Sequence, residues 1–249
     1  MAAFGKVGLG SEGNRLLIYL PTSLMFSFEF GEKMTAITSA ASFIEFLVGR
    51  GVLTFGDFTL NSGRKSPYFF NLGSVDDGLG LLTLGRAYAD AIVASKIEFD
   101  VLFGPAYKGI PIAVATALAL AERGTNVGVA YNRKEAKDHG EGGNLVGAPV
   151  KGRILLVDDV LTSGKAIRTA VDLIKAEEAD IAGVVIALDR AEFDPSGQTA
   201  VDTLSADLAA PMVSIAGVAD VISFLQRQND MHSVLQSMRE YQQAYCKLA

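Results

Sequence analysis

The chain has 249 residues, of which 49% are hydrophobic and 20% charged, so it can bury one sizeable core and we predict a single α/β domain with small appendages. The formal net charge of -6 argues against a general nucleic-acid binder, although a local basic site for an anionic substrate is compatible with it. Cys246 is the only cysteine, which excludes an intramolecular disulfide framework and fits a reducing cytosol. No run of about 18 apolar residues, as a membrane span requires, occurs in the sequence.

Residues 1–33 differ in character from the rest, and we predict that they form an N-terminal extension to a domain at residues 34–249. Their apolar stretch is short and lacks the small-residue cleavage pattern of a secretory signal. Gly8, Gly10 and Gly13 match the GxGxxG pattern, but only seven residues precede them, so the strand of a dinucleotide-binding unit is missing. The extension is predicted to be disordered, a packing arm, or an artefact of cloning or of the start site.

The hydrophobic periodicity of the remaining residues predicts strands that alternate with helices, which is typical of a mainly parallel sheet. In chain order the predicted elements are helix 39–50, strands 52–60 and 64–71, helix 78–96, strand 99–103, helix 112–122, strands 126–131 and 154–157, a helix after residue 165, strand 181–188, helix 201–208, strand 212–215 and helices 218–227 and 231–245.

Two stretches in the first half of the domain are candidates for ligand contacts. In strand 64–71, Phe69 and Phe70 face opposite ways because side chains alternate along a strand, so at least one of them is predicted to lie in the core. Residues 104–111 read GPAYKGIP and follow a buried strand, which is where ligands bind outside the sheet of an α/β protein. Lys108 is the only formal charge in this loop, and a solvated helix cap is the alternative reading for it.

Residues 133–147 have the most unusual composition in the chain. They include six formally charged residues and four glycines and are almost free of apolar residues, so we predict that they do not pack as a core element. Arg133, Lys134, Lys137 and His139 would suit a flexible lid that closes over a polyanion. A solvated hairpin is the alternative.

The stretch 152–166 reads GRILLVDDVLTSGKA and predicts a strand, a turn and the start of a helix. The turn precedes helical amides that lack partners, and with the hydroxyls of Thr162 and Ser163 it favours a phosphate, which the backbone at Gly164 can approach closely. Asp158 and Asp159 would repel that phosphate unless they bind hydroxyl groups or a hydrated cation. A sugar phosphate carries both features, whereas a purely structural strand end is the alternative, and the residues do not match a Walker A loop.

The last candidate is Arg190, which follows the predicted strand 181–188. An arginine at the carboxyl end of a strand is well placed to receive a carboxylate in a bidentate fork. A structural ion pair with Asp189 or Glu192 is the competing interpretation.

Five motifs, in one order, resemble those of the bacterial orotate phosphoribosyltransferases, which belong to the type I phosphoribosyltransferase family. They are FTLNSGRKSPYFFN, LFGPAYKGIP, NRKEAKDHGEGG, ILLVDDVLTSGKA and ALDRAE. The resemblance implies an α/β fold with a central, mainly parallel sheet flanked by helices, a small hood subdomain and a flexible lid loop. It also implies an enzyme of pyrimidine biosynthesis that transfers ribose 5-phosphate from phosphoribosyl pyrophosphate (PRPP) to orotate, with Mg²⁺.

The same resemblance implies roles for individual residues and for partners. The implied catalytic residues are Lys137, His139, Asp158 and Asp159. The implied PRPP contacts are Tyr107, Lys108, Arg133, Lys134, Lys137, His139, Asp158, Asp159, Val160, Leu161, Thr162, Ser163, Gly164, Lys165 and Ala166. The implied orotate contacts are Phe69, Phe70, Thr162 and Arg190. No side chain is expected to bind the metal directly, and a cytoplasmic homodimer that shares its lids across the interface is expected, without nucleic-acid or membrane partners.

One residue departs from the family pattern. Asn61 stands where the bacterial enzymes usually have a lysine that contacts PRPP or orotate, so either the backbone makes that contact or one charge-assisted bond is missing. Two alternative functions remain, a phosphoribosyltransferase for another base and a PRPP-binding regulatory protein.

Overall fold

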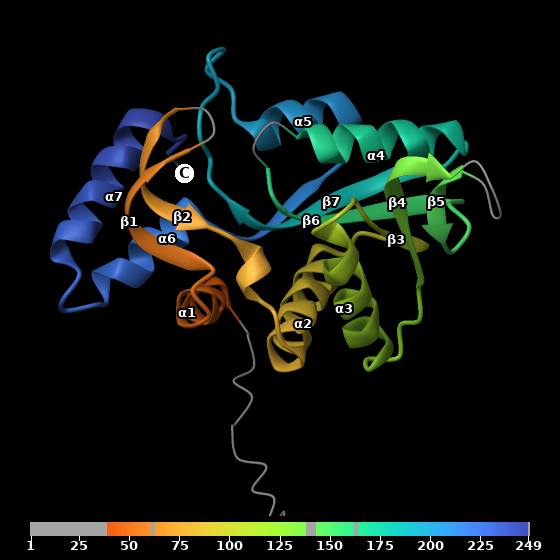
Figure 1. The fold of residues 1–249 in the computed structure, drawn as a ribbon, viewed down its shortest axis with the longest axis horizontal. Helices are drawn as coiled ribbons and strands as arrows, with labels where there is room; N and C mark the ends of the chain where they lie inside the picture. Colours follow the sequence, from red (N-terminus) through yellow and green to blue (C-terminus); the bar gives the residue numbers. More distant parts are fainter. Residues whose placement is uncertain (1–38, 61–62, 138–142, 162–163, 249) are drawn as a thin grey trace, which may run out of the picture. The chain divides into compact units, whose positions relative to one another are not determined.

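A six-stranded sheet forms the centre of the fold (Figure 1). The computed structural model describes residues 39–60, 63–137, 143–161 and 164–248, all of which belong to one unit at residues 36–249. Neighbouring strands lie in the order β5–β4–β3–β6–β7–β8, and all pairs are parallel except β4 with β5. The bounds are β3 (Val101–Gly104), β4 (Gly128–Lys137), β5 (Gly143–Gly147), β6 (Arg153–Val160), β7 (Asp180–Asp189) and β8 (Met212–Gly217). The predicted mainly parallel sheet is confirmed.

Helices cover both faces of this sheet (Figure 1). Strand β6 shows why, because its side chains alternate between two apolar clusters. Ile154 and Leu156 pack in the cluster with α4 and α5, whereas Leu155 and Val157 pack in the cluster that includes the other helices. The bounds are α1 (Ala40–Gly49), α2 (Gly78–Ser95), α3 (Gly109–Ala121), α4 (Lys165–Ala176), α5 (Ala200–Leu208), α6 (Val218–Gln226) and α7 (His232–Tyr245).

A second, smaller sheet corresponds to the expected hood. It is an antiparallel pair, β1 (Leu53–Thr59) and β2 (Lys65–Phe70), and α7 packs against it (Figure 1). The rings of Tyr68 on β2 and Tyr241 on α7 meet edge to face at 6.0 Å. This contact joins the hood to the C-terminal helix, which follows it by more than 160 residues in the sequence.

Two element boundaries differ from the sequence prediction. Helix α3 begins at Gly109, three residues before the predicted start at 112, because Pro111 lies in the first turn, where a missing N–H costs nothing. Strand β4 continues to Lys137 rather than ending at residue 131, since its polar end pairs with β5, for example Asn132 with Leu145. The described parts of the predicted lid segment, residues 133–137 and 143–147, therefore lie in two antiparallel strands. The predicted extension at residues 1–33 lies outside the described residues.

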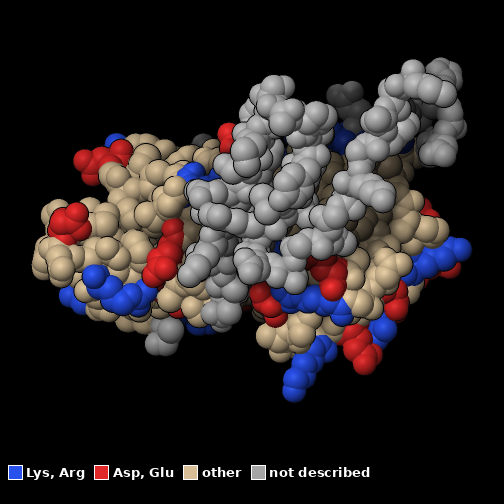
Figure 2. Space-filling view, turned by 90° about the horizontal axis from the view of Figure 1, so that it is seen from below, with Lys and Arg blue, Asp and Glu red and all other residues tan. Residues whose placement is uncertain are grey.

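The face of the unit that carries α2 and α3 shows both signs of charge on its described surface (Figure 2). Ion pairs join α2 to the two residues that follow α3, with Arg86 Nη2 at 3.0 Å from Glu122 Oε2 and Arg123 Nη1 at 2.7 Å from Asp90 Oδ1. This mixture differs from the basic stripe that a nucleic-acid binder presents. Within the described ranges, no helix is both long enough and apolar enough to cross a membrane.

Candidate active site

The candidate site lies where the chain reverses its direction of travel across the sheet. Strands β3 and β6 are neighbours, but the chain leaves β3 through α3 toward β4, on one side, and leaves β6 through α4 toward β7, on the other. Loops that diverge in this way leave a crevice at the carboxyl ends of the strands, which is the usual ligand position in open α/β sheets. The loop after Gly104 and the loop after Val160 therefore border the same crevice.

An ion pair across this crevice joins the two loops. Lys108 Nζ lies 2.6 Å from Asp159 Oδ2, although the residues are 51 positions apart in the sequence. The lysine side chain is 50% exposed and the aspartate side chain 9% exposed. The other oxygen of Asp159 accepts the N–H of Val160 at 2.8 Å. Lys108 is thus more than a solvated helix cap, and its ammonium group can reorient toward an anion without leaving the site.

The neighbouring carboxylate, Asp158, is also buried and has an unusual proton affinity. Burial and repulsion from Asp159 raise the pKa of Asp158 to about 7, against the lowering effects of the Asp159 N–H and of Lys108. Its Oδ1 accepts that N–H at 3.0 Å, and its main-chain carbonyl accepts the buried hydroxyl of Tyr88 at 2.7 Å. The Asp158 side chain is therefore held in place, and its pKa lies close to neutral pH. It can exchange hydrogen bonds with hydroxyl groups.

Two glycines allow the loop after β3 to turn back tightly on α3. A Cβ atom at Gly104 would lie 2.2 Å from the carbonyl oxygen of Gly109, and one at Gly109 would lie 2.8 Å from the carbonyl oxygen of Val157. Both neighbours are main-chain atoms that cannot move aside independently. Close packing at the edge of the crevice therefore requires glycine at both positions.

We expect Gly104→Ala to destabilise the protein by at least about 1–3 kcal/mol, because the new methyl group overlaps main-chain atoms. The same change at Gly49 in α1 is the control, since no described heavy atom lies within 4 Å of its added Cβ, and there alanine should stabilise by about 0.5–1 kcal/mol. Urea unfolding followed by circular dichroism measures both. Equal stabilities of Gly104→Ala and wild type would contradict the packing argument.

Asn132, on β4, is a further residue that contacts this loop and that the sequence analysis did not identify. Its buried side chain accepts the N–H of Ala106 at 3.1 Å and donates to the carbonyl oxygen of Arg133 at 3.3 Å. The first of these bonds holds the loop at the N–H of Ala106, in the peptide that precedes the cis Ala106–Tyr107 bond. The available signal was a polar residue directly after the predicted strand 126–131.

The predicted lid residues begin beside this loop. Lys134 Nζ lies 4.5 Å from the centroid of the exposed Tyr107 ring, a cation–π contact that places both predicted pyrophosphate contacts together. Arg133 Nη1 donates instead to the carbonyl oxygen of Gly143 on β5, at 3.3 Å. Lys137 is the last residue of β4, but its side chain and all of His139 lie outside what the structure describes.

The predicted phosphate loop leads into α4 as expected. Gly164 occupies the N-cap position of α4 with a φ of +66°, a conformation that favours glycine, and it has no side chain to cap the first amides. Lys165 and Ala166 are exposed in the first turn, whereas the side chain of Leu161 packs in the core, so Leu161 can offer a ligand only its main chain. Thr162 and Ser163 lie outside the described residues.

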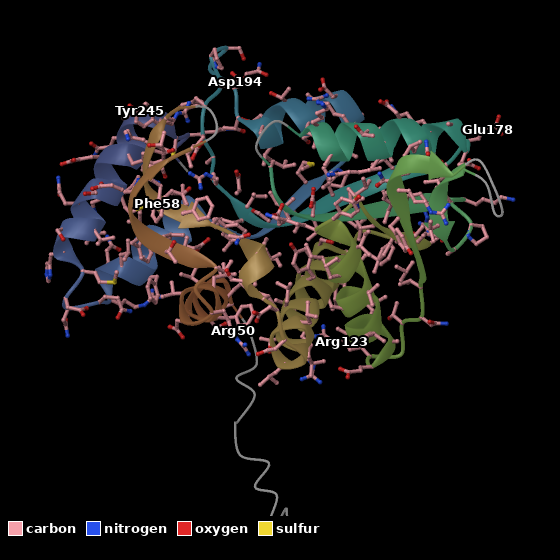
Figure 3. All side chains as sticks on the ribbon, in the orientation of Figure 1. Arg50, Phe58, Arg123, Glu178, Asp194 and Tyr245 are labelled. Atoms are coloured by element: carbon pink, nitrogen blue, oxygen red, sulfur yellow. The ribbon has the colours of Figure 1, made fainter. Side chains whose placement is uncertain are left out.

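The two phenylalanines of β2 separate as predicted. Phe70 is 7% exposed and belongs to the core, whereas Phe69 is 44% exposed and stacks on Phe58 of β1 at 5.5 Å between ring centroids. Phe58 is labelled in Figure 3. Phe69 is thus the phenylalanine that offers ring surface to a planar ligand. Asn61, in the turn before β2, lies outside the described residues.

Arg190 is buried at the carboxyl end of β7 and forms the ion pair that the sequence analysis had kept as an alternative. Its Nε donates to Glu192 Oε1 at 2.6 Å and its Nη2 to Ser66 Oγ at 3.2 Å. Asp189, the other partner considered, instead accepts the N–H of Ala191 at 2.7 Å. The guanidinium group also lies 4.1 Å from the centroid of the Tyr68 ring. Arg190 therefore contacts the hood, although it directly follows β7 of the main sheet.

Comparisons with known proteins agree with this geometry. The model of the phosphoribosyl transferase domain matches residues 72–205, which include both loops of the crevice. Curated orotate phosphoribosyltransferases of Klebsiella pneumoniae and Vibrio vulnificus are each 52% identical to this chain over 204 residues, covering 82% of this chain and 96% of theirs. The crystal structure of orotate phosphoribosyltransferase from Francisella tularensis has a TM-score of 0.74 and 37% identity, covering 83% of this chain and 100% of that one. The fold is therefore that of a type I phosphoribosyltransferase, and the chain belongs to the orotate phosphoribosyltransferase family of enzymes.

Proposed function

We propose that the protein transfers ribose 5-phosphate from PRPP to N1 of orotate, which yields orotidine 5′-monophosphate and pyrophosphate in pyrimidine biosynthesis. The observation that carries the proposal is the pairing of Lys108 with Asp159 at the crevice, beside the uncapped start of α4. A cation can bind the pyrophosphate, and two buried carboxylates can bind the ribose diol. The helix N-terminus can bind the 5′-phosphate.

The ribose 5-phosphate would bind along the loop from Asp158 to Ala166. The first amides of α4 and the backbone at Gly164 would hold the phosphate, since they carry the positive end of the helix dipole. Asp158 and Asp159 would accept hydrogen bonds from the ribose hydroxyl groups. Because Lys108 already neutralises Asp159, the diol has to replace part of that ion pair.

Lys108 then becomes available for the pyrophosphate. Its side chain is half exposed, so rotation about its long stem can bring the ammonium group to the leaving group. The bond from the anomeric carbon to pyrophosphate stretches in the transition state, and negative charge collects on the pyrophosphate oxygens. Cations aimed at those oxygens lower the barrier because they are positioned before the charge develops.

Mg²⁺ fits the donor set if the substrate supplies most of its ligands. Among the residues that the structure describes, no cluster of three or more histidine, cysteine, aspartate or glutamate side chains could hold a metal ion. Mg²⁺ in phosphate-transfer sites is typically bound by one or two carboxylates together with substrate phosphates and water. Asp158 and Asp159 would hold it through ribose hydroxyl groups or water, and the ion would neutralise charge on the pyrophosphate.

The lid and the subunit arrangement are part of the same proposal. Arg133, Lys134, Lys137 and His139 would close over the pyrophosphate and exclude water, which would otherwise hydrolyse the sugar. We place this lid in the active site of a partner subunit, so that the working form is a cytoplasmic homodimer. The contact of Lys134 with the Tyr107 ring supports the proposal for the start of the lid, which we call the lid base.

Orotate would bind between the hood and the end of β7. Phe69 would lie against its ring, Thr162 would contact its edge, and Arg190 would receive its carboxylate. This arrangement favours an acidic pyrimidine over a purine base.

Orotate consumption, followed by its ultraviolet absorbance, tests the function. We expect loss of orotate only when enzyme, PRPP and Mg²⁺ are all present, and no loss when any one of them is omitted. Adenine and hypoxanthine in place of orotate are the controls for base choice. Turnover of a purine but not of orotate would assign a different base, and PRPP binding without any turnover would favour a regulatory protein.

A further inference from the structure

The buried guanidinium group of Arg190 is held on several sides by protein groups. Glu192 Oε1 lies 2.6 Å from both Nε and Nη2, Ser66 Oγ accepts a second bond from Nη2, and the Tyr68 ring lies beneath the plane. Burial opposes the charge of Arg190, yet the charges of Tyr68 and Glu192, with the hydrogen bonds that Arg190 donates to Glu192 and Tyr241, keep its pKa above the ordinary value. The group is therefore charged and fixed before any substrate arrives.

Glu192, the carboxylate that holds Arg190, is itself held from the C-terminal helix. The hydroxyl of Tyr241 on α7 donates to the same Oε1 atom at 2.7 Å. Arg64, next to β2, approaches the other oxygen of Glu192 at 3.3 Å and donates to the carbonyl oxygen of Phe193 at 2.9 Å. Main-chain bonds tie this segment to the end of α7, since the N–H of Phe193 donates to the carbonyl oxygen of Tyr245 at 2.8 Å. Tyr245 is labelled in Figure 3.

Glu192 lies between two arginines and pairs with both. Arg64 and Arg190 contribute two positive charges, and Glu192 contributes one negative charge shared between them. Glu192 bonds Arg190 through Oε1 and Arg64 through Oε2, and the hydroxyl of Tyr241 adds a second contact to the oxygen that holds Arg190.

We propose that Glu192 and Tyr241 are positioning residues for the base, which fix Arg190 in the orientation that receives the carboxylate of orotate. The C-terminal helix thereby becomes part of the base specificity of the enzyme, although none of its residues touches the substrate. This inference rests on the proposed function, in which Arg190 binds the substrate carboxylate. It assigns to α7 a role in the binding of orotate and none in the binding of PRPP.

Tyr241→Phe is the sharpest test, because it removes a single oxygen atom and retains the ring that packs on Tyr68. We expect the KM for orotate to rise about 10-fold, as for the loss of one hydrogen bond to a charged group, while the KM for PRPP stays within about 2-fold. Glu192→Gln should raise the orotate KM further. Tyr245→Phe is the matched control, the same substitution one turn further along α7, and it should leave both constants unchanged.

A double-mutant cycle separates positioning from a general loss of structure. In the Arg190→Lys background, Tyr241→Phe should have little further effect on the KM for orotate, because the group that it positions is gone. An unchanged orotate KM in Tyr241→Phe, an equal rise for both substrates, or full additivity with Arg190→Lys would overturn the inference. Failure of the proposed function is distinguishable, since the wild type itself would then not consume orotate.

Discussion

Asp158→Asn is expected to make the protein more stable than the wild type above pH 7 while it removes tight binding of PRPP. The wild-type carboxylate is buried beside Asp159, and these two causes raise its pKa from 3.8 to about 7. Asparagine has nearly the same shape and carries no charge, so it relieves both causes and can still accept the N–H of Asp159. The ribose diol, however, loses a charged acceptor.

The pH dependence of this effect has a definite sign. Below about pH 3 the carboxyl group is mostly protonated in the folded and the unfolded states, and the substitution should matter little. As the pH rises toward 7 the unfolded chain releases the proton and the folded protein retains it, so the wild type loses stability relative to the variant. The difference should level off above pH 7 at roughly 2–4 kcal/mol, since one pKa unit corresponds to about 1.4 kcal/mol.

Thermal unfolding at pH 5 and pH 8, together with calorimetric titration of PRPP, measures both parts of this prediction. Each kcal/mol should raise Tm by about 2–4 °C for a chain of this size. Asp76→Asn makes the same substitution at an exposed carboxylate and controls for net charge. A Tm difference that is the same at both pH values, or undiminished PRPP affinity, would refute the account of Asp158.

Lys137→Ala is expected to lower kcat by roughly 10²–10³-fold, which is typical of the loss of one preorganised donor to a developing anion. Lys137 is the last residue of β4, paired with Gly143 of β5, so its main chain continues directly from the lid base at Lys134. In the proposed mechanism its ammonium group reaches the pyrophosphate only when the lid has closed. The KM for PRPP should change less than kcat, because the contact is strongest in the transition state.

Steady-state kinetics with saturating PRPP and orotate measure this effect. Lys175→Ala, at an exposed position in the last turn of α4, removes the same charge elsewhere and should leave kcat unchanged. A kcat for Lys137→Ala equal to that of the wild type would exclude Lys137 from stabilisation of the leaving group.

Local patterns in the sequence were sufficient for most of the helices and strands, and for several details of the site. The period of apolar residues identified α4 through Ile167, Val171 and Ile174, all of which are buried. The alternation rule separated Phe69 from Phe70. Boundaries failed where pairing or a helix start overrode composition. The charged segment after residue 132 continues β4 because β5 supplies hydrogen-bond partners, and α3 begins before Pro111.

The sequence by itself determined which chemical groups are present and in what order, because motifs such as Asp158-Asp159 before a glycine turn are local. Only the tertiary structure decided how distant groups combine. It brought Lys108 to Asp159 across the crevice, anchored Ala106 on Asn132, and placed Tyr241 behind Arg190. The physical reason is that sheet order and helix packing set these distances, and both depend on apolar contacts between segments that are far apart in the chain.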